Sequence, residues 1–129
     1  MNKTLIKIIA VYLWWLSLIF FITLIFGSSP LLADGTLLGD FLIRHPYQYD
    51  FEFMFSILFL VWGIFLWRAS DNILINKTLI QFSAWAFITH AVVFIIIGLV
   101  DQNILLHALM DSVWWILAGM FLFKVLKSE

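Results

Sequence analysis

Four long apolar stretches dominate the sequence, at about residues 5–26, 51–67, 78–100 and 104–124. A helix that crosses a bilayer needs about 20 largely apolar residues, whereas the strands of a membrane barrel alternate between apolar and polar residues. These stretches are continuously apolar, and 64% of the whole chain is hydrophobic while only 12% is charged. The sequence therefore predicts an all-α membrane protein, a bundle of four transmembrane helices that forms a single domain over residues 1–129.

The basic residues indicate how these helices are oriented. Lysine and arginine are enriched in cytoplasmic segments of membrane proteins. Only Arg44 falls in the long connection after the first stretch, and the other basic residues fall on the opposite side: Lys3, Lys7, Arg68, Lys77, Lys124 and Lys127. This pattern predicts four spans with both termini in the cytoplasm.

The long outer connection has a periodic pattern of its own. Its apolar residues recur at helical spacing opposite three charged ones: Leu37, Leu38, Phe41 and Leu42 against Asp34, Asp40 and Arg44. Such a pattern is typical of a short amphipathic helix that lies in the membrane interface. We expect it to cap the bundle or to contact a partner.

The pentapeptide NKTLI occurs twice, at residues 2–6 and 76–80. Each copy lies at the cytoplasmic start of a predicted span, so the repeat could record the duplication of a two-helix hairpin. The residues that follow share little. A helix start favours Asn or Thr, and an interfacial Lys is common, so the simpler interpretation needs no shared ancestry.

Several classes of site and partner are excluded by composition. The chain contains no cysteine, so it forms no disulfide, binds no metal through thiolates and attaches no haem covalently. Its formal net charge is −1, and it has no basic tail or run of charges. A nucleic-acid partner is therefore not expected.

Polar residues inside the predicted spans are the best guides to function, because inserting them into a membrane is costly. His90 lies near the middle of the third span, and Ser17 and Ser56 are at a similar depth in the first two. We expect these three residues to form a middle polar layer with interhelical hydrogen bonds. Gly63 and Gly119 are expected to allow neighbouring helices to approach closely.

A second polar layer is predicted near the outer surface, formed by Thr23, Glu52 and His107 with Asp111 one turn deeper. Helical side chains tilt toward the N-terminus of their own helix, so Asp111 is expected to lean toward His107 and pair with it. Glu52 also leans outward and either joins the pair or reaches water. His90 leans the other way, so water rather than direct contact is expected between it and Asp111.

Two cofactor hypotheses arise for these residues. Haem ligation by two histidines requires both rings on one iron, and His90 and His107 differ too much in depth. A metal site from His107, Asp111, Glu52 and the loop residue His45 is chemically possible, but a His and an Asp four residues apart also form an ordinary helix pair. We predict no bound metal and no cofactor.

Two segments resemble a group of small bacterial membrane proteins: FMFSILFLVWGIFLWRASDNILINKTLIQFSAWAFITHAVV and LLHALMDSVWW. The most specific features are Arg68-Ala69-Ser70-Asp71, His90, and His107 followed by Asp111. The layout is similar to that of BphX-like and DoxX-like proteins, over roughly the last three spans. This resemblance implies a four-helix membrane fold and an accessory role without a settled substrate, and it provides no catalytic residues to carry over.

The predicted function is that of a small inner-membrane accessory or interaction protein that associates with itself or with a larger membrane complex. The alternative is a small-molecule-binding or proton-linked transport protein that uses His90, His107 and Asp111, with Glu52 as a further candidate. A membrane enzyme or redox protein is a third possibility, for which the sequence offers no catalytic motif.

Overall fold

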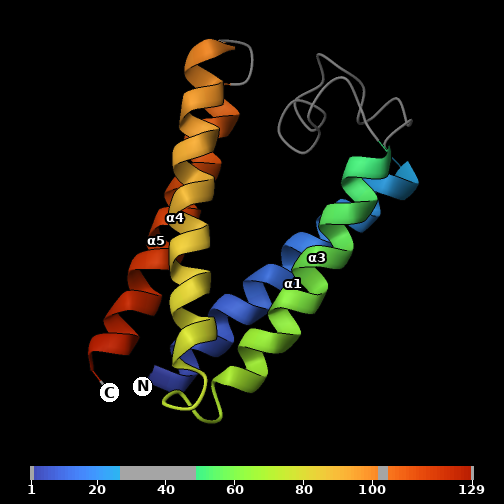
Figure 1. Cartoon of the computed structure of the whole chain (residues 1–129). Coiled ribbons are helices and arrows are strands. Elements are labelled where there is room, and N and C mark those ends of the chain that lie inside the picture. The colour runs from blue at the N-terminus through green and yellow to red at the C-terminus, as the bar shows by residue number, and fades with distance from the viewer. Residues whose placement is uncertain (1, 27–48, 102–104, 129) are drawn as a thin grey trace. The chain divides into compact units, whose positions relative to one another are not determined.

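The computed structural model describes residues 2–26, 49–101 and 105–128, apart from the side chains of Tyr49, Phe51, Glu52 and Leu106. The described residues form four helices: α1 (Asn2–Phe26), α3 (Tyr49–Ala69), α4 (Lys77–Val100) and α5 (Leu105–Lys127) (Figure 1). The all-helical architecture predicted from the sequence is confirmed. The predicted interfacial helix of the outer connection lies outside the described residues.

Three of the helical segments are long and apolar enough to cross a bilayer, namely Asn2–Phe26, Lys77–Val100 and His107–Lys127. The fourth, Phe53–Ala69, is apolar but shorter. The spans predicted from the sequence start and end within a few residues of the observed helices. This agreement is expected, because an unbroken apolar run without helix-breaking residues can satisfy its main-chain groups only within a helix when water is absent.

Hydrogen-bonded turns and basic side chains are found at the ends of the helices. The amide of Asp101 donates to the carbonyl of Ile97 at 2.8 Å and closes the last turn of α4. Arg68 lies in the last turn of α3, and Lys124 and Lys127 lie in the last turn of α5. Cations at these positions interact favourably with the negative end of the helix dipole.

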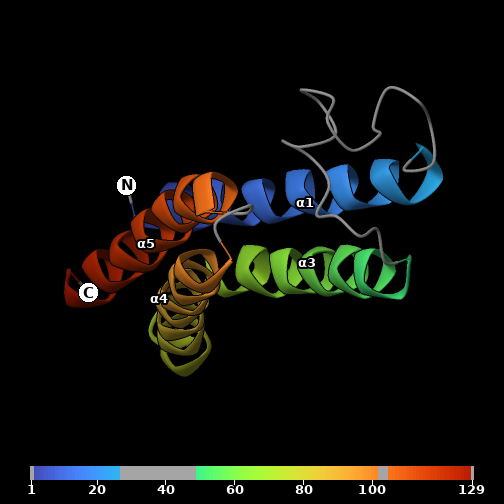
Figure 2. The same ribbon diagram turned by 90° about the horizontal axis from the view of Figure 1, so that it is seen from above.

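The chain divides into two compact units, each centred on a pair of helices. One comprises Ala10–Phe65, in which α1 and α3 pack together, and the other comprises Met1–Ile9 and Leu66–Glu129, in which α4 and α5 pack together. Two perpendicular views show the partners of each pair side by side (Figures 1 and 2). Each pair is an antiparallel helical hairpin.

Hydroxyl groups connect the helices of the first pair. The Ser17 hydroxyl donates to the carbonyl of Ser56 at 2.7 Å, and the Ser56 hydroxyl donates back to the carbonyl of Ser17 at 3.1 Å. Three aromatic rings pack nearby, since Phe55 and Phe59 both lie within 6 Å of Phe20 between ring centroids. Both serines are buried.

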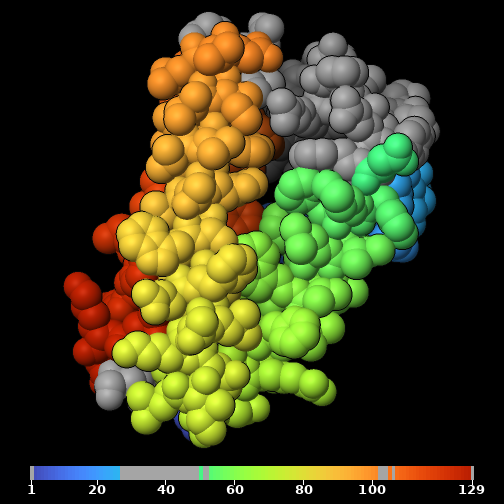
Figure 3. Space-filling view, in the orientation of Figure 1, coloured from blue at the N-terminus to red at the C-terminus, as the bar shows by residue number. Residues whose placement is uncertain are grey.

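The outward faces of the helices are apolar along most of their length. Space-filling atoms of α4 form one continuous outer surface (Figure 3). The exposed residues of α4 and α5 include Phe82, Trp85, Val92, Val93, Ile96, Leu99, Leu109, Met110, Val113, Trp114, Leu117, Met120 and Phe121. Soluble monomers rarely expose apolar surface on this scale.

Each helix pair also has a glycine that lies close to a backbone carbonyl of the neighbouring helix. A Cβ atom at Gly63 would lie 2.9 Å from the carbonyl oxygen of Ala10, and one at Gly119 would lie 2.8 Å from that of Ala84. A carbonyl oxygen belongs to the helix backbone and cannot move aside as a flexible side chain can. Both positions therefore require glycine for the observed packing.

We expect Gly119→Val to destabilise the α4–α5 pair by about 1–3 kcal/mol, the range typical of overpacking. The neighbouring Met120→Val, at an exposed position, is the matched control and should change stability by less than about 0.5 kcal/mol. Unfolding in mixed micelles, followed by the loss of helical signal, measures both values. Equal stabilities of the two variants would contradict the close approach at Gly119.

Candidate functional site

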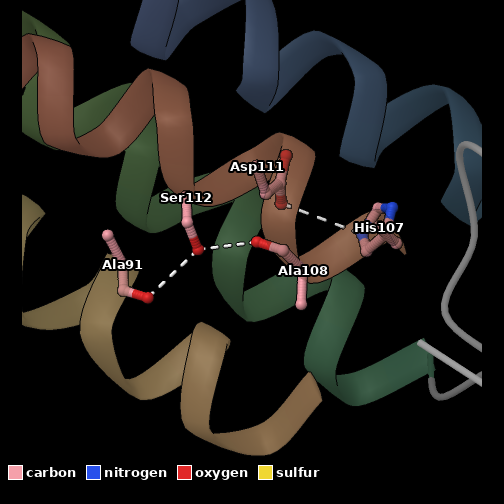
Figure 4. A network of polar contacts seen from close by, with 5 residues as sticks. All are labelled: Ala91, His107, Ala108, Asp111 and Ser112. Carbon is pink, nitrogen blue, oxygen red and sulfur yellow. Dashed lines mark hydrogen bonds and ion pairs between the residues drawn. The ribbon is translucent and has the colours of Figure 1, made fainter. Parts of the chain in front are cut away.

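The structure brings His107 and Asp111 together on one side of α5. The Nε2 atom of His107 lies 3.8 Å from the Oδ2 atom of Asp111, one helical turn away (Figure 4). The two side chains keep 30% and 37% of their surface exposed. This separation permits an ion pair when the imidazole is protonated, while the exposure leaves room for a further polar partner.

His90 lies in the middle of α4, where it is half-buried among aromatic rings. Its imidazole stacks on Phe94 with 4.8 Å between ring centroids. Trp115 of α5 approaches the imidazole edge-on at 5.0 Å. Among the described residues, His90 is held by these ring contacts rather than by a hydrogen bond.

Geometry relates the three polar residues. Asp111 lies beside His107 on α5, and its neighbour Ser112 contacts Ala91, the residue next to His90 on α4. The described residues contain no ion pair or hydrogen bond that joins His90 to Asp111 directly. The arrangement is a carboxylate beside one imidazole and near the level of a second, a set of groups that can bind and exchange a proton.

Ser112 fixes the level at which α5 meets α4 beside this site. Its buried hydroxyl lies 3.0 Å from the carbonyl oxygen of Ala91 on α4 and 2.6 Å from that of Ala108 on its own helix. Figure 4 shows Ser112 pointing toward α4 while Asp111 points along α5 toward His107. Ala91 follows His90 in the chain, so this contact holds Asp111 and His90 at neighbouring levels.

The other residues predicted for the two polar layers have different surroundings. Ser17 and Ser56 are joined, although through main-chain carbonyls and not through an imidazole. The Thr23 hydroxyl is buried and donates to the carbonyl of Phe20 in its own helix at 2.9 Å. Glu52 belongs to α3, but its side chain lies outside the description. His45 is also outside the described residues.

A metal centre is not supported by the described part of the chain. Within it, no three side chains of His, Asp or Glu come together in a way that could hold a metal ion. His107 and Asp111 supply two such groups. The other two residues of the metal hypothesis, Glu52 and His45, have side chains that the structure does not describe.

Sequence reasoning missed two residues that shape this site, Ser112 and Phe94, and it placed Trp115 at the depth of His90 without predicting their contact. A serine within an apolar helix is common, and aromatic residues are abundant in this chain, so none of the three was conspicuous. Trp115 lies one helical turn from Asp111, and Phe94 one turn from His90. Helical spacing from the two candidate residues was therefore the signal that could have found both rings.

Comparison with known proteins gave no relatives: no protein-family model, curated protein or solved structure matches the chain.

We expect Ser112→Ala to destabilise the α4–α5 pair by about 1 kcal/mol, the usual size of an interhelical hydrogen bond within a membrane. Ser70→Ala is a suitable control, since the buried Ser70 hydroxyl donates to the carbonyl of Trp67 within the same chain segment. The measurement is the free energy of unfolding in mixed micelles. A loss for Ser112→Ala no greater than that for Ser70→Ala would show that the contact to Ala91 contributes nothing.

Proposed function

We propose that this chain is a four-span integral protein of a bacterial inner membrane, with both termini in the cytoplasm. We further propose that it is an accessory or interaction protein, which associates with itself or with a larger membrane complex. The resemblance to BphX-like and DoxX-like proteins points to the same role.

The distribution of apolar surface supports insertion into a membrane. Exposed apolar residues occur along α1, α3, α4 and α5. The buried polar side chains of the described residues are all hydroxyl-bearing: Ser17, Thr23, Ser56, Ser70, Ser83 and Ser112. A protein that is apolar on its outer faces and nearly apolar inside is suited to a hydrocarbon solvent.

Contacts within one unit support the orientation. The side-chain amide of Asn2 donates to the Ser128 hydroxyl at 2.9 Å, and Lys7 Nζ lies 3.7 Å from Asp71. The start of α1, the end of α5 and the turn after α3 therefore lie at one end of this unit. That end carries most of the basic residues, so the positive-inside rule assigns it to the cytoplasm.

The His107–Asp111 pair is the observation that supports association. Both side chains remain about one third exposed on a helix whose other exposed residues near them are apolar, such as Met110 and Trp114. Partly exposed polar groups are unfavourable against hydrocarbon and are stabilised by a protein partner or by water at the interface. A partner at this face of α5 would cover them.

A second candidate function is the binding of a proton or a small polar molecule by His90, His107 and Asp111. The specific observation in its favour is that Asp111, which pairs with His107 on α5, is held by the Ser112–Ala91 contact near the level of His90 on α4. An ordinary helix pair needs only the contact between Asp111 and His107.

Association can be tested with two differently tagged copies of the full chain, which are co-expressed and extracted together with surrounding lipid. We expect capture through one tag to retain either the second tagged copy or one larger membrane complex in a constant ratio. Because the pair faces the partner in this proposal, His107→Leu combined with Asp111→Leu should reduce the recovered partner several-fold.

Met110→Leu, an apolar exchange at an exposed position of the same helix, is the matched control and should leave recovery unchanged. A chain recovered alone in its own lipid shell would contradict the accessory role. Unchanged recovery of the partner with the double variant would contradict the part assigned to the pair.

A further inference from the structure

We infer that the chain contains two equivalent copies of one helical hairpin, α1–α3 and α4–α5. We further infer that His90, Asp111 and His107 form a proton-binding site which replaces apolar contacts in the second copy. The site rests on the second candidate function above, whereas the repeat does not depend on it.

The first observation is the repeated NKTLI segment. The interval along the chain from Asn2 to Asn76 also separates Ala10 from Ala84. Helix capping does not account for both asparagines, because Asn76 makes no side-chain capping hydrogen bond to the described residues and its amide instead donates to the carbonyl of Asn72 at 2.8 Å. The Asn2 amide donates to Ser128. Side-chain capping therefore does not explain the asparagine of the second copy.

The second observation is a hydrogen bond that recurs at equivalent positions. The Ser56 hydroxyl donates to the carbonyl of Ser17 at 3.1 Å, and the Ser112 hydroxyl shares its hydrogen between the carbonyl of Ala108 in its own helix at 2.6 Å and that of Ala91 at 3.0 Å. The interval from Ser17 to Ala91 equals that between the two NKTLI segments. Both bonds run from the second helix of a pair to the first.

The third observation is the close approach at glycine. Gly63 faces the carbonyl of Ala10 in one pair, and Gly119 faces that of Ala84 in the other. Gly63 follows Ser56 by the same interval as Gly119 follows Ser112. The serine hydrogen bond and the glycine contact therefore give the same alignment of α1 with α4. They also give the same alignment of α3 with α5.

Burial follows the same alignment. Buried positions coincide in the first helices of the two pairs: Ile6 with Ile80, Ile9 with Ser83, Ala10 with Ala84, and Leu13 with Phe87. They also coincide in the second helices: Ser56 with Ser112, Phe59 with Trp115, Leu66 with Leu122, and Ala69 with Val125. Internal repeats of this kind are common in membrane proteins.

The copies differ at the candidate site. Under this alignment His90 occupies the position of Leu16, Asp111 that of Phe55, and His107 that of Phe51. All three ionisable residues of the candidate site thus have apolar equivalents in the first hairpin.

The aromatic contacts show how His90 replaces Phe55 as the central ring of its hairpin. In the first hairpin the Phe55 ring lies 5.9 Å from Phe20 and 5.6 Å from Phe59. Their equivalents are Phe94 and Trp115, and the ring that contacts both of these is His90, at 4.8 and 5.0 Å. In the second hairpin the central ring therefore belongs to α4, as His90. The position of Phe55 on the second helix then needs no ring, and it holds Asp111.

The exchange has a chemical consequence. The first hairpin packs with a leucine and a phenylalanine, so packing alone does not require His90 and Asp111. Ionisable groups in a membrane are costly, and they are generally retained for binding or transfer. The titratable groups within these two helices are His90 on α4 and His107 and Asp111 on α5, while Lys77, Asp101, Lys124 and Lys127 lie at or beyond helix ends. A carboxylate that pairs with one imidazole and lies near the level of a second has a proton as its simplest ligand.

The repeat is tested by exchanging residues between equivalent positions in the full-length protein. We expect His90→Leu and Asp111→Phe each to lower the denaturant midpoint, the first by removing a ring and the second by adding one. The double variant restores the leucine–phenylalanine pair of the first hairpin and should unfold at or above the wild-type midpoint. His90→Leu combined with Val113→Phe, at an exposed position, is the control and should not recover.

The equivalence of the hairpins would be overturned if the decrease in midpoint of the His90→Leu/Asp111→Phe variant equalled the sum of the decreases of the two single variants. Such a result would leave the site itself standing, because the site is measured separately.

The site is tested by nitrogen NMR of the histidines during a pH titration of the full-length protein in lipid nanodiscs, with the proton as the probe. We expect Asp111→Asn to shift the titration midpoint of His90, which lies on the neighbouring helix. The control Asp71→Asn, in the turn after α3, should leave that midpoint unchanged. An unchanged His90 midpoint in Asp111→Asn would overturn the site and reduce it to the local His107–Asp111 helix pair.

Discussion

Main-chain hydrogen bonding is the constraint on which the rest of this structure depends, and the membrane proposed above would make this constraint strict. In the absence of water every amide and carbonyl needs a partner within the protein, and a helix provides one for all but its terminal groups. Side-chain hydroxyls then add cross-links by donating to carbonyls that already accept a helical bond, as Ser112 does at Ala91. Glycine at positions 63 and 119 allows the backbones to approach closely enough for such short side chains to reach. Small residues and hydroxyls, rather than large apolar side chains, therefore set the register of each helix pair.

His90, His107 and Asp111 depart from this pattern, since they carry ionisable groups where the pattern needs none. The two histidines are stabilised by different means, His90 by aromatic rings and His107 by the neighbouring carboxylate. In our interpretation the α1–α3 hairpin preserves the apolar version of the same packing, and the α4–α5 hairpin carries a polar function. The protein would then combine a scaffold half and a functional half built on one plan, with association and proton binding both located on the second hairpin.

The sequence predicted the helices well because an apolar run of membrane length has few alternatives, and Phe26, Val100 and Lys127 end helices close to the expected limits. Depth counting placed Ser17 beside Ser56 and His107 beside Asp111, since helical rise is constant. Depth counting could not identify the hydrogen-bond acceptor of each serine. The acceptors are main-chain carbonyls, which every residue has and which the sequence therefore does not distinguish. Ser112 was missed for the same reason, although its spacing to Gly119 repeats that of Ser56 to Gly63. The simpler interpretation of NKTLI rested on capping, which Asn76 does not perform within the described residues.

Cysteine cross-linking within the membrane tests most directly whether the two hairpins share one packing plan, because the chain contains no cysteine of its own. The two equivalent contacts give the pairs Ser17→Cys with Ser56→Cys, and Ala91→Cys with Ser112→Cys. A disulfide requires Cα atoms about 4.4–6.8 Å apart, which helices in such close contact provide. The account predicts that both pairs form an intramolecular disulfide on mild oxidation, with similar yields. Formation of one disulfide but not the other would contradict it.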